Sequence, residues 1–323
     1  MKAIRFQKTG GPEVLALEDV TLASPGPGQV RVRHTAIGVN FIDTYHRSGL
    51  YPVPLPSGLG LEAAGVVEAV ASDVTAVKPG DRVAYCSGPM GAYAEANNVS
   101  ASRLVKLPDG ISDETAAAAM LKGMTAQYLL KRTYKVQKGE TILFHAAAGG
   151  VGLIAGQWAK HLGANVIGTI GSDDKRSLAL SNGYAHVLNT RNEDWVARVR
   201  DITGGKGVPV VYDSVGKDTF EGSLNSLAVR GLLVSFGNAS GAVPPFEPGI
   251  LSAKGSLYLT RPTLMHYTAT PQELQETADD LFAVIASGAV KIAVHQRFRL
   301  EDARKAHEAL HSRATTGATI LTP

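Results

Sequence analysis

The chain has very little cysteine: Cys86 is the only one among 323 residues. A single thiol cannot form an intramolecular disulfide or supply a cysteine-rich zinc lobe. A secreted disulfide framework is therefore excluded, and the composition favours a cytoplasmic protein. No apolar run of the signal-peptide type follows Met1. The apolar stretch over 142–159 contains His145, Gln157 and four glycines, so we interpret it as buried core and expect no membrane span.

The chain also has little excess of one sign of charge over the other. Lys and Arg total 32 and Asp and Glu total 29, so the formal net charge is only +3. A field this weak, with no basic stripe, argues against a nucleic-acid partner. Aromatic residues make up 6% of the chain, whereas glycine, with 35 residues, exceeds its typical share of ~7%. The glycine surplus predicts many turns or close backbone approaches.

The hydrophobic pattern predicts an α/β protein of about two domains, at roughly 150 residues each. Up to about Lys122, short β-type runs alternate with turns, which is typical of an antiparallel β-domain. From about 139 to 256, apolar strand-like runs alternate with helical stretches, which is typical of a doubly wound parallel sheet. We expect strands over 141–144, 165–169, 208–212 and 231–236, and helices over 153–161, 174–181, 195–202 and 219–227.

The last residues are expected to return to the first domain. Residues 272–287 and 300–313 are predicted helices, and 319–321 is a predicted closing strand. Ser112, with Thr115 nearby, is expected to cap the helix that follows. The predicted organisation is 1–122 as the first part of the β-rich domain, 123–260 as the Rossmann nucleotide-binding domain, and 261–323 as the returning part.

The sharpest local signal is the segment from Thr141 to Leu153, where a buried strand runs into a glycine-rich turn and then opens a helix. This arrangement aims free backbone N–H groups and the positive helix end at a pyrophosphate. Against the pattern G-x-G-x-x-G, Ala147 replaces the first glycine, while Gly149 and Gly152 occupy the second and third. A tight turn that packs a helix on a strand is the alternative, but the βα units that follow favour a dinucleotide site.

The end of the second strand bears on the choice between NAD and NADP. NAD sites usually place a carboxylate about 20 residues after the turn, where it binds the ribose hydroxyls. Here the strand runs into Gly171 and Ser172 with no carboxylate at its tip. Lys175 and Arg176 follow, so a 2′-phosphate has room and neutralising charge, which favours NADPH. The aspartates at 173–174 oppose this, and a helix cap beside a solvated lysine stays open.

Several segments resemble the medium-chain dehydrogenase/reductase superfamily. They are the β-rich first domain, the glycine-rich turn and the segment 58–67. In the zinc alcohol dehydrogenases of that superfamily, the last segment reads Gly-His-Glu, and its His is a catalytic zinc ligand. Here Leu61 stands at the His position and Cys86 is the only thiol, so we expect no metal site of that type.

Within the superfamily, the chain resembles the zinc-independent quinone oxidoreductases of the zeta-crystallin type. The matching segments span nearly the whole chain in the family's order: 38–45, 48–52, 121–125, 212–216, 235–238 and 312–315. The resemblance implies a GroES-like catalytic domain beside the Rossmann domain. It also implies a homodimer and NADPH-dependent reduction of a quinone in an interdomain cleft.

The resemblance further implies the site residues. Asn40 and Tyr45 are expected at the reacting end. Close relatives carry a Tyr at the position of Thr190 that helps to enclose the adenosine end; this chain lacks it, and Arg191 next to it adds charge. The residues expected at the cofactor are Phe41, Ile42, Asp43, Thr44, Gly123, Thr125, Ala148, Gly149, Gly150, Val151, Gly171, Ser172, Lys175, Thr190, Ser214, Phe236, Gly237, Asn238 and Arg313.

Hydride reduction of a quinone needs no strong base, because the acceptor is electrophilic and the cofactor carries the difficult chemistry. The protein must align the donor carbon and stabilise the oxygen that gains charge. Tyr45 is the candidate hydrogen-bond donor, and Asn40 orients the nicotinamide or the carbonyl. A half-buried packing role for Tyr45 and a local turn role for Asn40 stay open.

Other motifs have structural interpretations. Residues 307–311 match the zinc pattern H-E-x-x-H, but 312–323 contain no further ligand, and an apolar stripe makes the pair ordinary helix surface. Cys86 is interpreted as a packing residue and Asp213 as the cap of a turn. Two other functions compete with quinone reduction: an NADPH-dependent enone or alkenal double-bond reductase, and a non-catalytic NADPH-binding protein of crystallin-like or RNA-associated kind.

Overall fold

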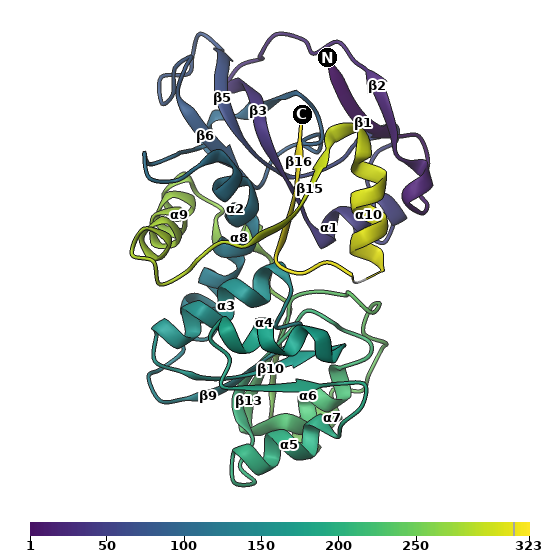
Figure 1. The fold of residues 1–323 in the computed structure, drawn as a ribbon, viewed down its shortest axis with the longest axis vertical. Helices are drawn as coiled ribbons and strands as arrows, with labels where there is room; N and C mark the ends of the chain where they lie inside the picture. The colour runs from purple at the N-terminus through teal and green to yellow at the C-terminus, as the bar shows by residue number, and fades with distance from the viewer. Residues whose placement is uncertain (313) are drawn as a thin grey trace. The chain divides into compact units, whose positions relative to one another are not determined.

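The computed structural model describes residues 1–312 and 314–323. The chain forms two compact units, which are labelled by element in Figure 1. Unit 1 comprises Met1–Met124, Thr268–Ala286 and Ile292–Pro323, and unit 2 comprises Thr125–Tyr267 and Ser287–Lys291. Arg313, expected at the cofactor, lies outside the described residues.

Unit 2 is built on a six-stranded sheet in the order β11-β10-β9-β12-β13-β14, and every neighbouring pair is parallel. The order reverses between β9 and β12, which places the switch point of the sheet at the carboxyl ends of these two strands. The predicted doubly wound sheet is therefore confirmed. Its strands are β9 (Thr141–Phe144), β10 (Asn165–Ile170), β11 (His186–Asn189), β12 (Val208–Asp213), β13 (Leu227–Ser235) and β14 (Tyr258–Thr260).

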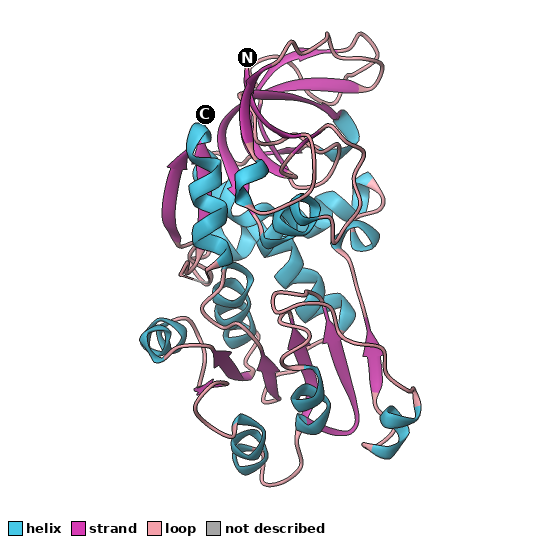
Figure 2. Ribbon diagram, turned by 90° about the vertical axis from the view of Figure 1, so that its right-hand side faces the viewer, coloured by secondary structure: helices cyan, strands magenta, loops and turns pink. Residues whose placement is uncertain are grey.

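Helices cover both faces of this sheet. In Figure 1, α3 and α4 lie on one face and α5, α6 and α7 on the other. Figure 2, turned by 90°, shows the same strands in magenta between cyan helices. The helices are α3 (Gly150–His161), α4 (Arg176–Ser181), α5 (Trp195–Ile202), α6 (Phe220–Ser226) and α7 (Gly249–Ala253), with the short α8 (Leu264–Tyr267) at the end of the unit.

Two boundaries in unit 2 differ from expectation. The helix predicted over 174–181 begins as a 3-10 turn, Asp173–Lys175, and becomes α-helical only at Arg176. The strand predicted to begin at 231 starts at Leu227, because Leu227 pairs with Val208 across a register irregularity. The three-residue edge strand β14 has no counterpart in the sequence-based prediction.

Unit 1 contains two sheets. The larger has the order β15-β16-β3-β5-β6-β8, with β7 also paired to β3, and the smaller has the order β2-β1-β4. Strand β16 pairs antiparallel with β3, so the end of the chain joins the first sheet. The strands are β1 (Lys2–Phe6), β2 (Ala16–Asp19), β3 (Gln29–Val39), β4 (Ser57–Gly58), β5 (Glu62–Val70), β6 (Arg82–Tyr85), β7 (Ala96–Ser100), β8 (Val105–Lys106), β15 (Val294–Arg299) and β16 (Ala318–Thr322).

The long helices of unit 1 are α1 (Phe41–Ser48), α9 (Pro271–Ala286) and α10 (Ala303–His311). Helix α2 (Asp113–Tyr128) passes from unit 1 into unit 2 between Met124 and Thr125. The predicted cap of α2 is confirmed, since the Thr115 N–H donates to Ser112 Oγ at 3.1 Å. A core of buried side chains, including Phe6 and Tyr93, joins the smaller sheet to β3 and α10.

Candidate functional site

The predicted phosphate-binding turn joins β9 to α3 in unit 2. The helix starts at Gly150, with Gly149 as its N-cap. Position 152 requires glycine, because a Cβ there would lie 2.3 Å from the carbonyl oxygen of Ala146. Alanine fits at position 147 because β10 contributes a glycine opposite it: a Cβ on Gly168 would lie 2.7 Å from the Ala147 Cβ.

Free donors at the start of α3 fit a pyrophosphate. Within the described ranges, no group accepts a hydrogen bond from the N–H of Gly150, Val151 or Gly152, whereas the Leu153 N–H donates to the Gly149 carbonyl at 2.9 Å. Helix α3 has twelve residues, and the positive end of its dipole lies at its N-terminus, beside these N–H groups. Donors and dipole together make this turn suited to an anion.

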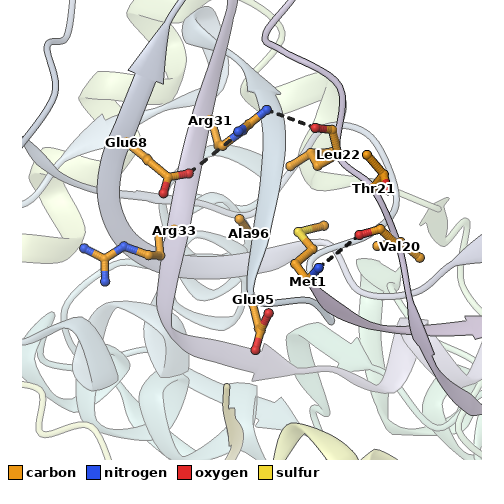
Figure 3. Close-up of a pocket in the computed structure, with 9 residues that line it drawn as sticks. All are labelled: Met1, Val20, Thr21, Leu22, Arg31, Arg33, Glu68, Glu95 and Ala96. Carbon is orange, nitrogen blue, oxygen red and sulfur yellow. Dashed lines mark hydrogen bonds and ion pairs between the residues drawn. The ribbon is translucent and has the colours of Figure 1, made fainter.

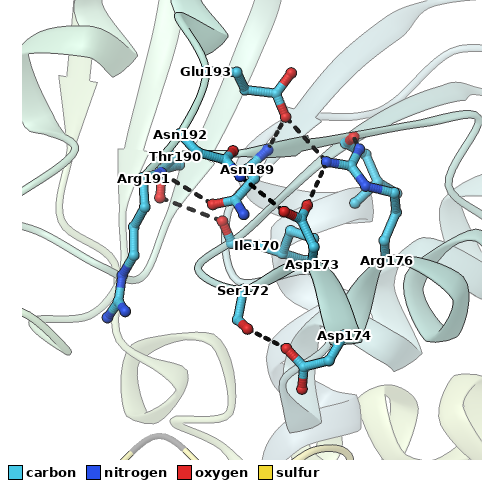
Figure 4. Close-up of polar contacts among 11 residues, drawn as sticks. Ile170, Ser172, Asp173, Asp174, Arg176, Asn189, Thr190, Arg191, Asn192 and Glu193 are labelled. Carbon is cyan, nitrogen blue, oxygen red and sulfur yellow. Dashed lines mark hydrogen bonds and ion pairs between the residues drawn. The ribbon is translucent and has the colours of Figure 1, made fainter.

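The ends of β10 and β11 carry the residues expected at the adenosine ribose (Figure 4). The Thr190 N–H donates to the Ile170 carbonyl at 3.0 Å, which ties the two strand ends together. Ser172 lies at the start of the 3-10 turn and donates its hydroxyl to Asp174, and Lys175 ends that turn. A Cβ on Gly171 would meet only Arg191 Nε, at 3.8 Å, so this strand end is open.

The arginine expected to help neutralise a 2′-phosphate is engaged elsewhere. Arg176 donates to Asp173 at 2.7 Å and to Glu193 at 3.2 Å. Asn192 adds a hydrogen bond to Asp173 at 2.8 Å, and together these contacts hold the pKa of the Asp173 carboxyl below its usual value. Arg176 therefore neutralises the two acids beside the strand end, and its contact with a 2′-phosphate stays a prediction.

The ends of β12 and β13 bring Ser214, Phe236, Gly237 and Asn238 together. The Phe236 N–H donates to the Asp213 carbonyl at 2.7 Å, and a Cβ on Gly237 would lie 2.6 Å from the Ser214 carbonyl oxygen. The Asp213 carboxylate accepts the N–H groups of residues 215 and 216 at 2.8 and 3.0 Å. The prediction that Asp213 caps this turn is confirmed.

A buried network that the sequence did not reveal ties the strand ends together. Ser223 Oγ donates to Asp213 Oδ2 at 2.7 Å, so it accepts from His145 Nε2 at 3.0 Å. Nδ1 of the same ring then accepts from Thr169 Oγ1 at 2.8 Å. Burial lowers the pKa of His145, against the opposing charge of Asp213, so the ring is neutral. β9, β10, β12 and α6 are thereby fixed relative to one another.

The residues expected at the reacting end lie on α1 in unit 1. Asn40 is the N-cap residue and is only 3% exposed; Tyr45 is 8% exposed. The Tyr45 ring packs edge-on against Phe41 and Tyr51, with centroids 5.6 and 5.2 Å apart. Of the other α1 residues expected at the cofactor, Phe41 and Ile42 are half-buried, and Asp43 and Thr44 are buried.

A fully buried carboxylate holds Asn40 in place. Glu62, at the start of β5, accepts from Asn40 Nδ2 at 2.7 Å, from the Leu121 N–H at 2.6 Å and from Lys122 Nζ at 3.4 Å. A Cβ on Gly38 would lie 2.2 Å from Glu62 Oε2, so this carboxylate explains the glycine in the segment before Asn40. Glu62 was not predicted, although it directly follows Leu61.

The first histidine of the H-E-x-x-H segment, His307, is not on the helix surface, which corrects the expectation for that residue, whereas the second, His311, is exposed as expected. His307 is fully buried, and Arg47 Nη1 donates to its Nδ1 at 3.0 Å. Nε2 therefore carries the proton and donates to Tyr93 Oη at 3.1 Å, while the tyrosine donates to Asp43 Oδ2 at 2.8 Å. Burial, aided by Arg47, lowers the pKa of His307 to about 3.

Asp43, which accepts the hydrogen bond from Tyr93, is buried as well. Burial raises the pKa of Asp43 to about 7, although hydrogen bonds from the Asn40 N–H and from Tyr93 oppose the shift. Its Oδ1 accepts no hydrogen bond from any part of the chain that the structure describes. Asp43 is thus a carboxyl group that anchors the start of α1.

The remaining predicted residues have mixed surroundings. Gly123 packs on α9, because a Cβ there would lie 2.4 Å from Leu281 Cδ1, and Thr125 is buried in α2. Cys86 is buried and its pKa is raised well above the usual value by that burial, which agrees with a packing role. Unit 1 has a cavity of about 370 Å³, and the residues that line it, drawn in Figure 3, include none of the predicted site residues.

Over 1–312 and 314–323, no group of three or more His, Cys, Asp or Glu side chains could hold a metal ion. No helix in the same ranges has the length and apolar character needed to cross a membrane.

Known proteins match this chain in sequence and in fold. Residues 26–109 match the alcohol dehydrogenase GroES-like domain, and residues 150–283 match the zinc-binding dehydrogenase family. A quinone oxidoreductase of Pseudomonas aeruginosa is 59% identical over 100% of this chain and 99% of its own. The crystal structure of Escherichia coli quinone oxidoreductase complexed with NADPH has 55% identity and a TM-score of 0.99 over 100% of both chains. A 2-haloacrylate reductase of Burkholderia is 46% identical over 98% of each chain.

The two units and the glycine-rich switch point define a protein of the zinc-binding dehydrogenase family. Within that family the chain belongs to the quinone oxidoreductases and is an enzyme. The expected resemblance, the Rossmann sheet and the GroES-like domain are confirmed.

Proposed function

We propose that this protein reduces quinones with NADPH. The single observation that carries the proposal is the likeness along the full chain to quinone oxidoreductases, at 59% and 55% identity, one of them solved with NADPH. The open donors at the start of α3 and the strand end without a carboxylate at Gly171 support it independently, because a pyrophosphate and a 2′-phosphate need those features.

We assign the cofactor to the carboxyl end of the unit 2 sheet. The turn over 148–151 holds the pyrophosphate through its N–H groups, and Ser172 and Lys175 receive the 2′-phosphate. The other contacts predicted in this unit are with Thr125, Gly171, Thr190, Ser214, Phe236, Gly237 and Asn238. In unit 1 we assign Phe41, Ile42, Asp43, Thr44 and Gly123 to the cofactor, and Arg313 retains its predicted role.

When bound, NADPH supplies the hydride, and with one proton from solvent the quinone becomes a hydroquinone. Tyr45 donates a hydrogen bond to the quinone oxygen that gains negative charge. Asn40 orients the reacting groups, and Glu62 fixes the Asn40 amide through the 2.7 Å hydrogen bond. Because Leu61 cannot ligate a metal, we assign the polarisation of the acceptor to hydrogen bonds.

Oxidation of NADPH by the purified protein, followed with a panel of quinones and no other acceptor, tests the function. We expect quinone-dependent turnover, with NADPH preferred over NADH. Tight NADPH binding without turnover on any acceptor would instead indicate the non-catalytic NADPH-binding protein.

Reduction of an activated double bond is the second candidate. The 46% identity to a 2-haloacrylate reductase favours it, since that protein's named substrate is an alkene conjugated to a carboxylate. The same assay with 2-chloroacrylate and with a simple enone separates the two functions. A higher kcat/KM for either alkene than for every quinone would replace quinone reduction by double-bond reduction.

We also infer a homodimer and a cytoplasmic location. The dimer follows from the family resemblance. Among the described residues, the short strand β14 is an edge of the unit 2 sheet, so its free side can pair with a second copy. The location follows from the single cysteine, which suits a reducing compartment. The quinone is the small-molecule partner of the proposed reaction.

A further inference from the structure

We propose that Arg191 makes the cofactor site selective for a 2′-phosphate by pairing its guanidinium with that group. This inference rests on the proposed use of NADPH and goes beyond it, because it names the residue that sets the preference over NADH. The sequence alone indicates only that Arg191 adds charge next to Thr190.

The backbone places Arg191 beside the strand end where the ribose is read. Ile170 of β10 pairs with Asn189 of β11, and Arg191 follows two residues after that pair. The Arg191 N–H donates to Asn189 Oδ1 at 3.0 Å, which fixes the start of the side chain. Its Nε lies 3.8 Å from the place of a Cβ on Gly171. The guanidinium therefore borders the position where this fold reads the 2′ substituent.

The guanidinium is available for a ligand. Arg191 is exposed, and in the part of the chain that the structure describes no acceptor forms a hydrogen bond or ion pair with its side chain. Arg176, the other arginine of this region, is committed to Asp173 and Glu193. In Figure 4 the two arginines leave the cluster on opposite sides.

Most of the nearby carboxylates are neutralised, so they repel a phosphate at this strand end only weakly. Asp173 accepts hydrogen bonds from Arg176 and Asn192. Glu193 accepts hydrogen bonds from Arg176 and from the Asn189 N–H. Asp174 is the carboxylate that remains close, where it accepts the Ser172 hydroxyl. Lys175 and Arg191 together oppose it with two cationic side chains.

The chemistry of arginine suits this position better than that of its neighbour. Thr190 is short, and its hydroxyl donates to the Ile170 carbonyl at 3.3 Å, so it points back to the strand. A guanidinium presents several N–H donors in one plane and binds a phosphate through two of them. Arg191 thus supplies at the adenosine end a contact that Thr190 cannot supply.

Titration calorimetry with 2′,5′-ADP and with 5′-AMP tests the proposal, because the two ligands differ by the 2′-phosphate alone. For Arg191→Ala we expect about ten- to hundredfold weaker binding of 2′,5′-ADP, the range typical of a charge-assisted hydrogen bond, and binding of 5′-AMP unchanged within about twofold. Arg191→Lys should recover part of the loss. Asp174→Asn should tighten 2′,5′-ADP, since it removes the opposing charge.

Arg198→Ala is the matched control, because Arg198 is also exposed on unit 2 and forms an ion pair with Asp201 at 3.4 Å. It should leave both ligands unaffected. Equal losses for both ligands in Arg191→Ala, no loss, or the same loss in the control would overturn the proposal. Neither ligand needs a quinone, so a protein without quinone turnover can still satisfy this test. A wild-type protein that binds the two ligands equally refutes the 2′-phosphate preference itself.

Discussion

Buried polar residues hold the proposed reacting end in place. The side-chain amide nitrogen of Asn40 donates a hydrogen bond to Glu62 at 2.7 Å, and its backbone N–H donates one to Asp43 at 2.8 Å. Tyr93 then connects Asp43 to His307. Groups in such a network have little freedom to turn, because a buried polar group left without a partner costs about 1–3 kcal/mol. Asn40 is therefore oriented before any ligand arrives.

Tyr45→Phe tests the assigned donor. Removing the hydroxyl should lower quinone turnover about ten- to hundredfold, because a donor aimed at developing charge acts mainly in the transition state. The Kd for NADPH should stay within about twofold, since the substitution leaves the cofactor site of unit 2 intact. Tyr258→Phe, on strand β14 of unit 2, is the control and should change neither quantity. Unchanged turnover in Tyr45→Phe would mean that ribose hydroxyls or water, and not Tyr45, polarise the quinone oxygen.

His307 predicts a specific dependence of stability on pH. The unfolded chain binds a proton at this residue below about pH 6.5, whereas the folded chain does so only near pH 3. The unfolded state therefore holds more protons between these values, and stability falls as the pH falls. At pH 5 the loss from His307 is about 2 kcal/mol. Asp43, with its pKa raised to about 7, contributes the opposite slope.

Urea unfolding at pH 7 and pH 5 isolates this contribution. His307→Gln keeps a donor and an acceptor for Tyr93 and Arg47 but cannot titrate, so its loss of stability on acidification should be about 2 kcal/mol smaller than that of the wild type. His311→Gln, at the exposed end of the same helix, should behave like the wild type. Identical pH dependence in the two variants would contradict the neutral, buried state of His307.

At the scale of elements, the turn between β9 and α3 depends on one close approach. Gly152→Ala brings a Cβ to 2.3 Å from the Ala146 carbonyl and 2.7 Å from the Ala147 carbonyl, so the backbone must shift. Such overpacking should cost about 1–3 kcal/mol of unfolding free energy. It should also weaken NADPH binding, because the N–H groups of the turn move with the backbone.

Gly249→Ala is the control for this helix start. Gly249 also lies in the first turn of a helix, α7, and a Cβ there meets nothing within 4 Å. Alanine at this position should leave binding unchanged and raise stability by at most about 1 kcal/mol. If Gly152→Ala matched this control in both stability and NADPH affinity, the proposed role of the turn would be wrong.

At the scale of the whole molecule, the proposed dimer has a candidate surface on unit 2. Tyr258 on the edge strand β14 is 62% exposed, and Val229, which packs on Gly255 just before that strand, is 74% exposed. An unpaired edge with exposed apolar side chains suits a second copy of the chain. Sedimentation equilibrium should give about twice the monomer mass of 33.9 kDa.

Tyr258→Lys should shift that protein toward the monomer, because a charge would then enter the interface. Leu180→Lys is the control, since Leu180 is exposed on α4 of the same unit and away from the edge strand. A wild-type monomer would contradict the dimer. Dissociation by Leu180→Lys, with none by Tyr258→Lys, would contradict the surface.

Local patterns predicted much of the fold. The bounds of β9 and α5 agree with the sequence-based ranges 141–144 and 195–202, because short, strongly apolar runs between turn signals leave little choice of register. The Asp213 cap was also predictable, since a strand-end aspartate binds the N–H groups just after it. These features depend on residues only a few positions apart.

The buried polar contacts could not be predicted in this way. Glu62 meets Asn40 across 22 residues, and Arg47 meets His307 across 260. Such pairs depend on which strands and helices the fold brings together, which a local pattern does not contain. His307 did carry one local sign: it lies four residues after the buried Ala303, on the face of α10 that packs on the core.

The most direct test of the account is the amount of hydroquinone formed per NADPH consumed by the purified protein, measured without oxygen. Reduction of a quinone by NADPH forms one hydroquinone for each NADPH consumed. The same mixture without the protein is the control and should form none. We predict that ratio. NADPH consumption without hydroquinone, or no consumption when quinone is added, would contradict the account.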